Sequence, residues 1–142
     1  MTTTRRGEAV ALAGLLAAAG VTHLVRPGFY DPIVPRALPG PARFWTYASG
    51  IAELAVAAAV AHPATRRAGG RAAAGLFVAV LPANVKMAAD WRHRRPTKRA
   101  IAYGRVPMQV PLIWWALRVA RAGRQAPADG GGRAVAARPT HT

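Results

Sequence analysis

Four long apolar stretches, separated by clusters of arginine, dominate the pattern along this chain. They cover residues 9–25, 44–61, 72–89 and 106–122. None shows the polar stripe at 3.6-residue spacing that marks a helix on the surface of a soluble protein. Each has about 17 residues, or roughly 26 Å of helix, which is near the shortest length that crosses a hydrocarbon core. The pattern predicts an all-α protein that forms a four-helix transmembrane bundle.

The segments outside these helices differ in composition. The first loop, residues 26–43, holds five prolines, and these rule out a continuous helix there. The same loop keeps aromatic and aliphatic side chains, so we expect it to fold across the mouth of the bundle. The loop at 91–105 is strongly basic. Residues 1–122 are expected to form one transmembrane domain, and residues 123–142, rich in Gly, Pro, Ala and Arg, a disordered basic tail.

Charge and cysteine content narrow the class of function. The chain of 142 residues has 20 Lys and Arg against 5 Asp and Glu, a net charge of +15, and no cysteine. The lack of cysteine excludes disulfides, thiolate metal sites and cysteine nucleophiles. A basic protein that binds nucleic acid is expected to carry its cations along one helix face beside aromatic residues. Here the cations lie at helix ends, which favours a multi-pass protein of the cell membrane with lipids, and not nucleic acid, as partners.

Two features leave other interpretations open. Alanine is abundant in the first two stretches and hardly favours the bilayer, so a soluble, alanine-rich helical protein stays an alternative. Arg5 and Arg6 stand before a short apolar run that ends in Ala17-Ala18-Ala19, which also fits a signal peptide, although no polar segment follows it. Lysines and arginines divide evenly between the two predicted sides of the membrane, so the positive-inside rule gives no orientation.

Each predicted helix carries a polar residue in the half of the membrane away from the N-terminus. These residues are His23, Glu53, Asn84 and Gln109. An ionised Glu53 at that depth costs on the order of 3 kcal/mol or more. We therefore expect it to be neutral, hydrogen-bonded or paired, with His23 and Asn84 as the available partners. The four residues form either a ligand or proton site or a set of contacts that only hold the helices together.

No cofactor motif accompanies this polar cluster. The sequence has no glycine-rich phosphate loop, no flavin motif and no pair of intramembrane histidines that would hold haem. No metal site is expected, and no catalytic residue can be assigned. Glu53 and His23 nevertheless supply an acid and a base at similar depth, which is compatible with proton exchange on a lipid-like ligand.

Several short motifs occur together along the chain. They are Gly20-Val-Thr-His23-Leu-Val-Arg-Pro27-Gly-Phe-Tyr30, Ile33-Val34-Pro35 with Leu38-Pro39, Ser49-Gly50-Ile-Ala-Glu53, and Pro82-Ala83-Asn84-Val85-Lys86-Met87. In combination they resemble the DoxX-like family of small bacterial four-helix membrane proteins, over roughly residues 9–120. The positions that match the recurring polar residues of that family are His23, Glu53 and Asn84. Lys86 departs from its pattern, which more often has an aromatic or apolar residue there.

The resemblance implies a four-helix membrane bundle, with relatives that include a subunit associated with quinol oxidation. It favours an accessory or quinone- and redox-associated membrane subunit, for which a bound quinone, a redox partner complex and a second copy of the chain are all compatible partners. The alternative is a membrane enzyme or transporter that acts on a lipid-like ligand with Glu53 and His23 as its acid–base pair. A soluble nucleic-acid binder is the third hypothesis.

Overall fold

The computed structural model describes residues 3–123, and their regular structure is entirely helical. The elements are α1 (Thr3–Val25), η1 (Pro27–Phe29), η2 (Asp31–Ile33), α2 (Ala42–Ala61), α3 (Arg66–Ala79), α4 (Leu81–Asp90) and α5 (Pro96–Ala122). The predicted all-α class is confirmed for this part of the chain. The described residues form five α-helices, however, and not the four that were predicted. The predicted disordered tail lies, apart from Gly123, outside the described residues.

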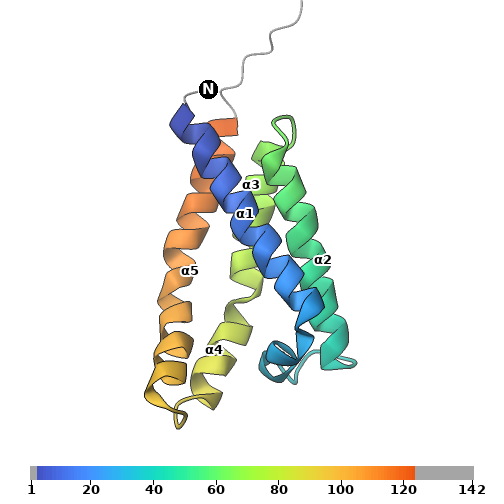
Figure 1. The fold of residues 1–142 in the computed structure, drawn as a ribbon, viewed down its shortest axis with the longest axis vertical. Coiled ribbons are helices and arrows are strands. Elements are labelled where there is room, and N and C mark those ends of the chain that lie inside the picture. The colour runs from blue at the N-terminus through green and yellow to red at the C-terminus, as the bar shows by residue number, and fades with distance from the viewer. Residues whose placement is uncertain (1–2, 124–142) are drawn as a thin grey trace, which may run out of the picture.

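The extra helix results from a break in the third apolar stretch, which was predicted as one helix over 72–89. α3 ends at Ala79 and α4 begins at Leu81. Pro82 has no backbone N–H and cannot continue the helical hydrogen-bond ladder. Helical hydrogen bonds are present on both sides of the break. Before it, the Val80 N–H donates to Leu76 O at 3.0 Å, and after it the Asn84 N–H donates to Val80 O at 3.1 Å. α4 continues below α3 in Figure 1.

Helices also extend into segments that were predicted as loops. α5 begins at Pro96 and not at 106, so the basic loop shrinks to residues 91–95. Proline fits the first turn of a helix because that N–H has no intrahelical partner in any case. α1 begins at Thr3, ahead of the predicted position 9. The apolar pattern marks only the apolar middle of a helix, while the hydrogen-bonded helix continues into the charged flanks.

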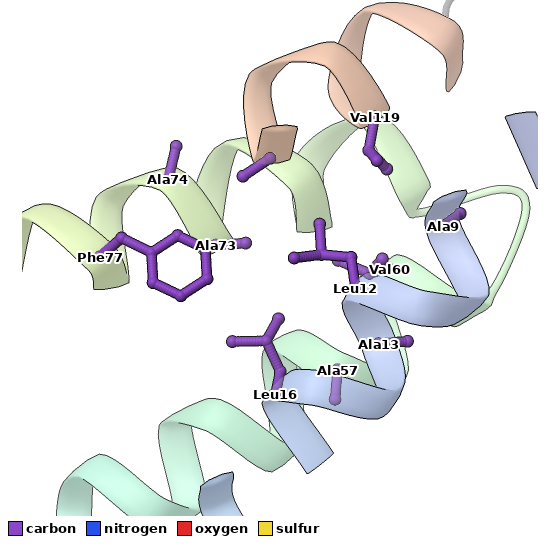
Figure 2. Close-up of a cluster of buried hydrophobic side chains, with 11 residues drawn as sticks. Ala9, Leu12, Ala13, Leu16, Ala57, Val60, Ala73, Ala74, Phe77 and Val119 are labelled. Carbon is purple, nitrogen blue, oxygen red and sulfur yellow. The ribbon is translucent and has the colours of Figure 1, made fainter. Parts of the chain in front are cut away.

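The helices form an elongated bundle with the Pro-rich loop at one end. α1 packs against α2, α3 packs against both α2 and α5, and α4 packs against α5. The start of α1 and the end of α5 lie at the upper end in Figure 1, while η1, η2 and the α4–α5 connection lie at the lower end. The upper half holds the main apolar core, shown in Figure 2. Its larger members are Leu12 and Leu16 of α1, Val60 of α2, Phe77 of α3 and Val119 of α5.

Small residues let the helices of this core approach closely. A Cβ placed on Gly69 would lie 2.6 Å from the backbone nitrogen of Val60, and one on Gly70 would lie 2.8 Å from that of Ala120. Neither position can hold a side chain without moving a neighbouring backbone. Close approach of this kind is typical of helix contacts in membranes, where small residues line the interfaces.

Three helical segments of the described chain are long and apolar enough to cross a membrane. They are Thr3–Val25, Ala42–Ala61 and Arg66–Asp90, the last made of α3 and α4 together. Only 28%, 28% and 33% of their most apolar windows are buried inside the protein, so most of this apolar surface faces outward. Exposed apolar surface on that scale indicates contact with lipid. α5, predicted as a fourth span over 106–122, is not among the three, because basic residues and prolines interrupt its 27 residues.

Candidate functional site

The crossing of α1 and α2 brings two of the predicted site residues together. A Cβ on Gly20 would lie 2.8 Å from Gly50 O, and a Cβ on Gly50 would lie 2.8 Å from the Cβ of His23. The two helices are therefore in direct contact at this glycine pair. His23 and Glu53 each follow their glycine by three residues, close to one helical turn. Contact at the glycines thus places the imidazole beside the carboxylate.

The His23–Glu53 pair is the most specific feature of this crossing. His23 Nδ1 lies 3.0 Å from Glu53 Oε2, and the two side chains are 13% and 11% exposed. Nδ1 also lies 2.8 Å from the backbone oxygen of Ala19. Because that oxygen can only accept, Nδ1 carries a proton. The proton is directed at Ala19, and Glu53 Oε2 accepts no well-aligned hydrogen bond within the described residues.

Tyr30, which the sequence analysis named only as the end of a motif and not as a site residue, packs against one face of the imidazole. Its ring stacks on that of His23 with centroids 3.6 Å apart and planes inclined by 23°. Its hydroxyl lies 2.8 Å from Thr22 Oγ1, which donates its only proton to Ala19 O at 2.7 Å. Tyr30 is therefore the donor to Thr22. A tyrosine in a Pro-rich loop gives no sequence signal for this contact, because the loop has first to fold back onto α1.

These residues border a cavity of about 600 Å³ at the lower end of the bundle. Its walls come from α1, α2, the α3–α4 junction, the Pro-rich loop and the side chain of Arg105 on α5. Most of the wall is apolar, with Ile33, Val34, Leu38, Leu76 and Val80 among its members. The polar lining includes His23, Thr46, Glu53, Asn84 and Arg105. Three of the four predicted site residues therefore share one cavity.

Asn84 supplies a buried hydrogen-bond donor to this cavity. It is 1% exposed, and its Oδ1 accepts from Arg105 Nε at 3.1 Å. Its Nδ2 has no partner within residues 3–123. A buried amide left without a partner costs about 1–3 kcal/mol, so the site presents a donor that an acceptor on a ligand would satisfy. Arg105 was predicted in a loop. It can reach Asn84 because α5 begins at Pro96 and carries Arg105 on a helix.

Gln109, the fourth predicted residue, is not part of this cavity. It is 6% exposed and lies on α5 between Pro107 and Pro111. Its Oε1 has no partner within the part of the chain that the structure describes. The prediction relied on a shared depth in the membrane, and depth alone does not determine which way a side chain points from its helix.

The Pro-rich loop is attached across the cavity to two helices. Asp31 accepts hydrogen bonds from Arg43 Nε at 2.8 Å and from Thr46 Oγ1 at 2.7 Å, both on α2. The bond from Arg43, helped by that from Thr46, holds the pKa of the Asp31 carboxyl below its usual value against the opposing effect of burial. On the other side, Lys86 Nζ of α4 donates to Pro32 O at 2.9 Å. Lys86 also forms the ion pair with Asp90 that its i+4 spacing suggests.

The arrangement offers hydrogen bonding and proton transfer. Within residues 3–123, no three His, Asp or Glu side chains are grouped closely enough to hold a metal ion. The cavity instead combines an imidazole–carboxylate pair, an unpartnered amide donor and a guanidinium group in mainly apolar walls. Such a cavity suits a molecule that is largely apolar and carries a few polar atoms.

A comparison with protein families gives one match. The family described as Domain of unknown function (DUF8561) matches residues 12–120, a range that includes every residue of the cavity. No curated protein and no solved structure matches the chain.

Proposed function

The chain belongs to the family described as Domain of unknown function (DUF8561), and we propose that it is a multi-pass membrane protein that binds an amphipathic, lipid-like molecule in its cavity. In this proposal α1, α2, the α3–α4 unit and α5 make four crossings of the cell membrane. The outward-facing apolar surface of the first three supports this arrangement. α5 would cross with Arg105 and Arg118 extended toward opposite interfaces.

The observation that carries the proposal is the pair of unpartnered polar atoms in an apolar cavity. Glu53 Oε2 and Asn84 Nδ2 are both buried and have no well-aligned hydrogen bond among the described residues, although Oε2 lies 3.0 Å from His23 Nδ1. Inside a bilayer water does not relieve such a deficit, so unsatisfied polar groups are costly there. A ligand with an acceptor for Asn84 and a donor for Glu53 would satisfy both atoms. A quinol ring with an apolar chain has both properties, because its hydroxyls donate and accept, whereas the oxidised quinone offers acceptors only.

Co-purification with a matched pair of variants tests this binding. Asn84→Leu removes the donor in the cavity, whereas Gln109→Leu removes a buried amide outside it that also has one unpartnered atom among the described residues. We expect native mass spectrometry of wild type in mild detergent to detect a bound lipid-soluble molecule. Asn84→Leu should lower its occupancy about tenfold, the equivalent of ~1.4 kcal/mol, and Gln109→Leu should leave it unchanged. Equal occupancy in all three proteins, or none in wild type, would contradict the proposal.

The His23–Glu53 contact favours a second candidate function, that of an enzyme or transporter that moves a proton to or from the ligand. His23 Nδ1 and Glu53 Oε2 lie 3.0 Å apart, which is within reach for proton transfer once the Nδ1 proton turns from Ala19 O toward the carboxylate. Glu53→Gln keeps the shape of the side chain but cannot ionise. If this function holds, the variant retains the ligand and loses the proton uptake or release that accompanies ligand addition in lightly buffered proteoliposomes. An unchanged proton signal would leave binding as the only function of the cavity.

An accessory role in a redox complex is compatible with the same cavity. The bundle would then hold a quinone-like molecule for a partner that carries out electron transfer. The native preparation that tests ligand binding would also recover that partner. A partner chain retained by wild type and by Gln109→Leu, but lost from Asn84→Leu, would tie the complex to the occupied cavity.

A further inference from the structure

A second, smaller pocket lies at the end of the bundle opposite the ligand cavity. The first turns of α1 and the last turns of α5 meet there, at the upper end of Figure 1. The pocket has a volume of about 240 Å³ and is lined by Arg5, Glu8, Arg118, Arg121 and Ala122. Three guanidinium groups thus surround one carboxylate. We propose that this pocket binds the phosphate of an anionic lipid head group.

The ion pairing inside the pocket leaves it cationic. Glu8 Oε1 accepts from Arg118 Nη2 at 2.8 Å, and the Arg118 guanidinium lies 5.4 Å from the centroid of the Trp114 ring. These two contacts hold the guanidinium in place, and a guanidinium has more donors than one carboxylate oxygen occupies. Arg121 is exposed, and its side chain makes no hydrogen bond or ion pair with residues 3–123. Its planar fork of donors matches the geometry of a phosphate.

The helix dipoles explain only part of this cluster. Arg121 stands in the last turn of α5, where a cation is favourable without any ligand. Arg5 stands near the start of α1, and the first turn of that helix holds no acidic residue. A cation at that end opposes the dipole, so local helix stability does not account for it. A bound anion would offset the mutual repulsion of the guanidinium groups that line the pocket.

The position of the pocket favours lipid as the source of the phosphate. Arg5 and His23 are separated by 18 positions on α1, or about 27 Å, so the pocket and the ligand cavity lie near opposite surfaces of a bilayer. Farther from the end, both helices carry exposed apolar residues, Val10 on α1 and Trp114 and Leu117 on α5. Acyl chains can lie against these residues while the phosphate occupies the pocket. Basic pockets between transmembrane helices bind anionic head groups in this way.

Lipid binding by charge-matched variants tests the proposal. Arg121→Gln removes one cation from the pocket, and Arg67→Gln removes one from the start of α3 at the same end, where Arg67 is exposed beside Gly123. Both proteins would be titrated with phosphatidylglycerol in phosphatidylcholine nanodiscs, and bound lipid counted by native mass spectrometry. We expect Arg121→Gln to weaken phosphatidylglycerol binding about fivefold and Arg67→Gln to weaken it less than about twofold.

Three results would overturn the proposal. An equal loss of phosphatidylglycerol affinity in Arg121→Gln and Arg67→Gln would mean a general effect of surface charge. Equal affinity of wild type for phosphatidylcholine and phosphatidylglycerol would mean no recognition of anionic lipid. Inorganic phosphate that binds as tightly as phosphatidylglycerol, and displaces it, would identify the free anion as the ligand. Asn84 and Gln109 do not line this pocket. The result of the phosphatidylglycerol titration is therefore independent of whether the ligand cavity is occupied.

Discussion

Two residues of the cavity, Glu53 and Asn84, each contact a protein partner, and each still has one buried polar atom without a well-aligned hydrogen bond. His23 approaches one carboxylate oxygen of Glu53, and Arg105 binds the amide oxygen of Asn84. Glu53 Oε2, the oxygen that His23 approaches, accepts no well-aligned hydrogen bond, and Asn84 Nδ2 has no partner among the described residues. In a protein core this deficit would be a defect. In a cavity that is otherwise apolar, it is the arrangement that a ligand with complementary atoms requires.

The glycine pair at the α1–α2 crossing is expected to control this site. In Gly50→Ala the new Cβ would lie 2.8 Å from His23 Cβ and 3.0 Å from Gly20 O, so the helices must separate. We expect a loss of about 1–3 kcal/mol in unfolding free energy, together with loss of the co-purified ligand, measured by thermal unfolding in detergent and native mass spectrometry.

Gly14→Ala on α1 is the matched control for that variant. A Cβ at Gly14 meets nothing within 4 Å, so this substitution should be neutral or stabilising by up to ~1 kcal/mol. If Gly50→Ala unfolds at the same temperature as Gly14→Ala and keeps its ligand, the crossing does not determine the position of His23.

At the scale of elements, the Pro-rich loop covers the cavity and is attached to α2 on one side and to α4 on the other. Asp31 connects it to α2 through Arg43 and Thr46, and Lys86 connects it to α4 through Pro32 O. The Trp45 indole adds a bond to Pro39 O at 2.7 Å. Loop residues line the cavity, so this attachment determines whether a ligand is enclosed.

The lowered pKa of Asp31 makes the attachment dependent on pH. Because the folded pKa of Asp31 lies below its ordinary value of 3.8, the stabilisation is complete above that value and is lost as the pH falls through the folded pKa. Asp31→Asn removes the charge at every pH. The difference in unfolding temperature between wild type and Asp31→Asn should therefore be full near pH 7 and shrink in strong acid. A difference that stays constant down to about pH 2 would show that the Asp31 charge does not hold the loop.

For the whole molecule, the sequence predicts the elements better than the contacts between them. The order and approximate positions of the apolar helices follow from apolar length and from the arginine clusters, which are local properties, whereas their number does not, because the third stretch divides into α3 and α4. The break at Val80 was missed because proline is frequent in transmembrane helices and does not always end one. The bond between Arg105 and Asn84 joins residues 21 positions apart. The bonds of Asp31 reach Arg43 and Thr46, which are 12 and 15 positions away. Such contacts depend on how helices and loops pack, and periodicity does not encode this.

The number of membrane crossings is the remaining property of the whole molecule, and it depends on α5. The chain has no cysteine, so single exposed positions can be labelled one at a time with a membrane-impermeant thiol reagent. Thr3→Cys at the start of α1 and Arg121→Cys in the last turn of α5 mark one end of the bundle, and Arg36→Cys in the Pro-rich loop and Arg94→Cys in the α4–α5 connection mark the other. With four crossings, the first two are labelled from one side of sealed vesicles and the last two from the other. Labelling of Arg121→Cys from the same side as Arg94→Cys would mean that α5 lies along the surface. That result would favour three crossings, in agreement with the three apolar segments, and would remove Arg121 from the leaflet in which a lipid phosphate could reach Arg5.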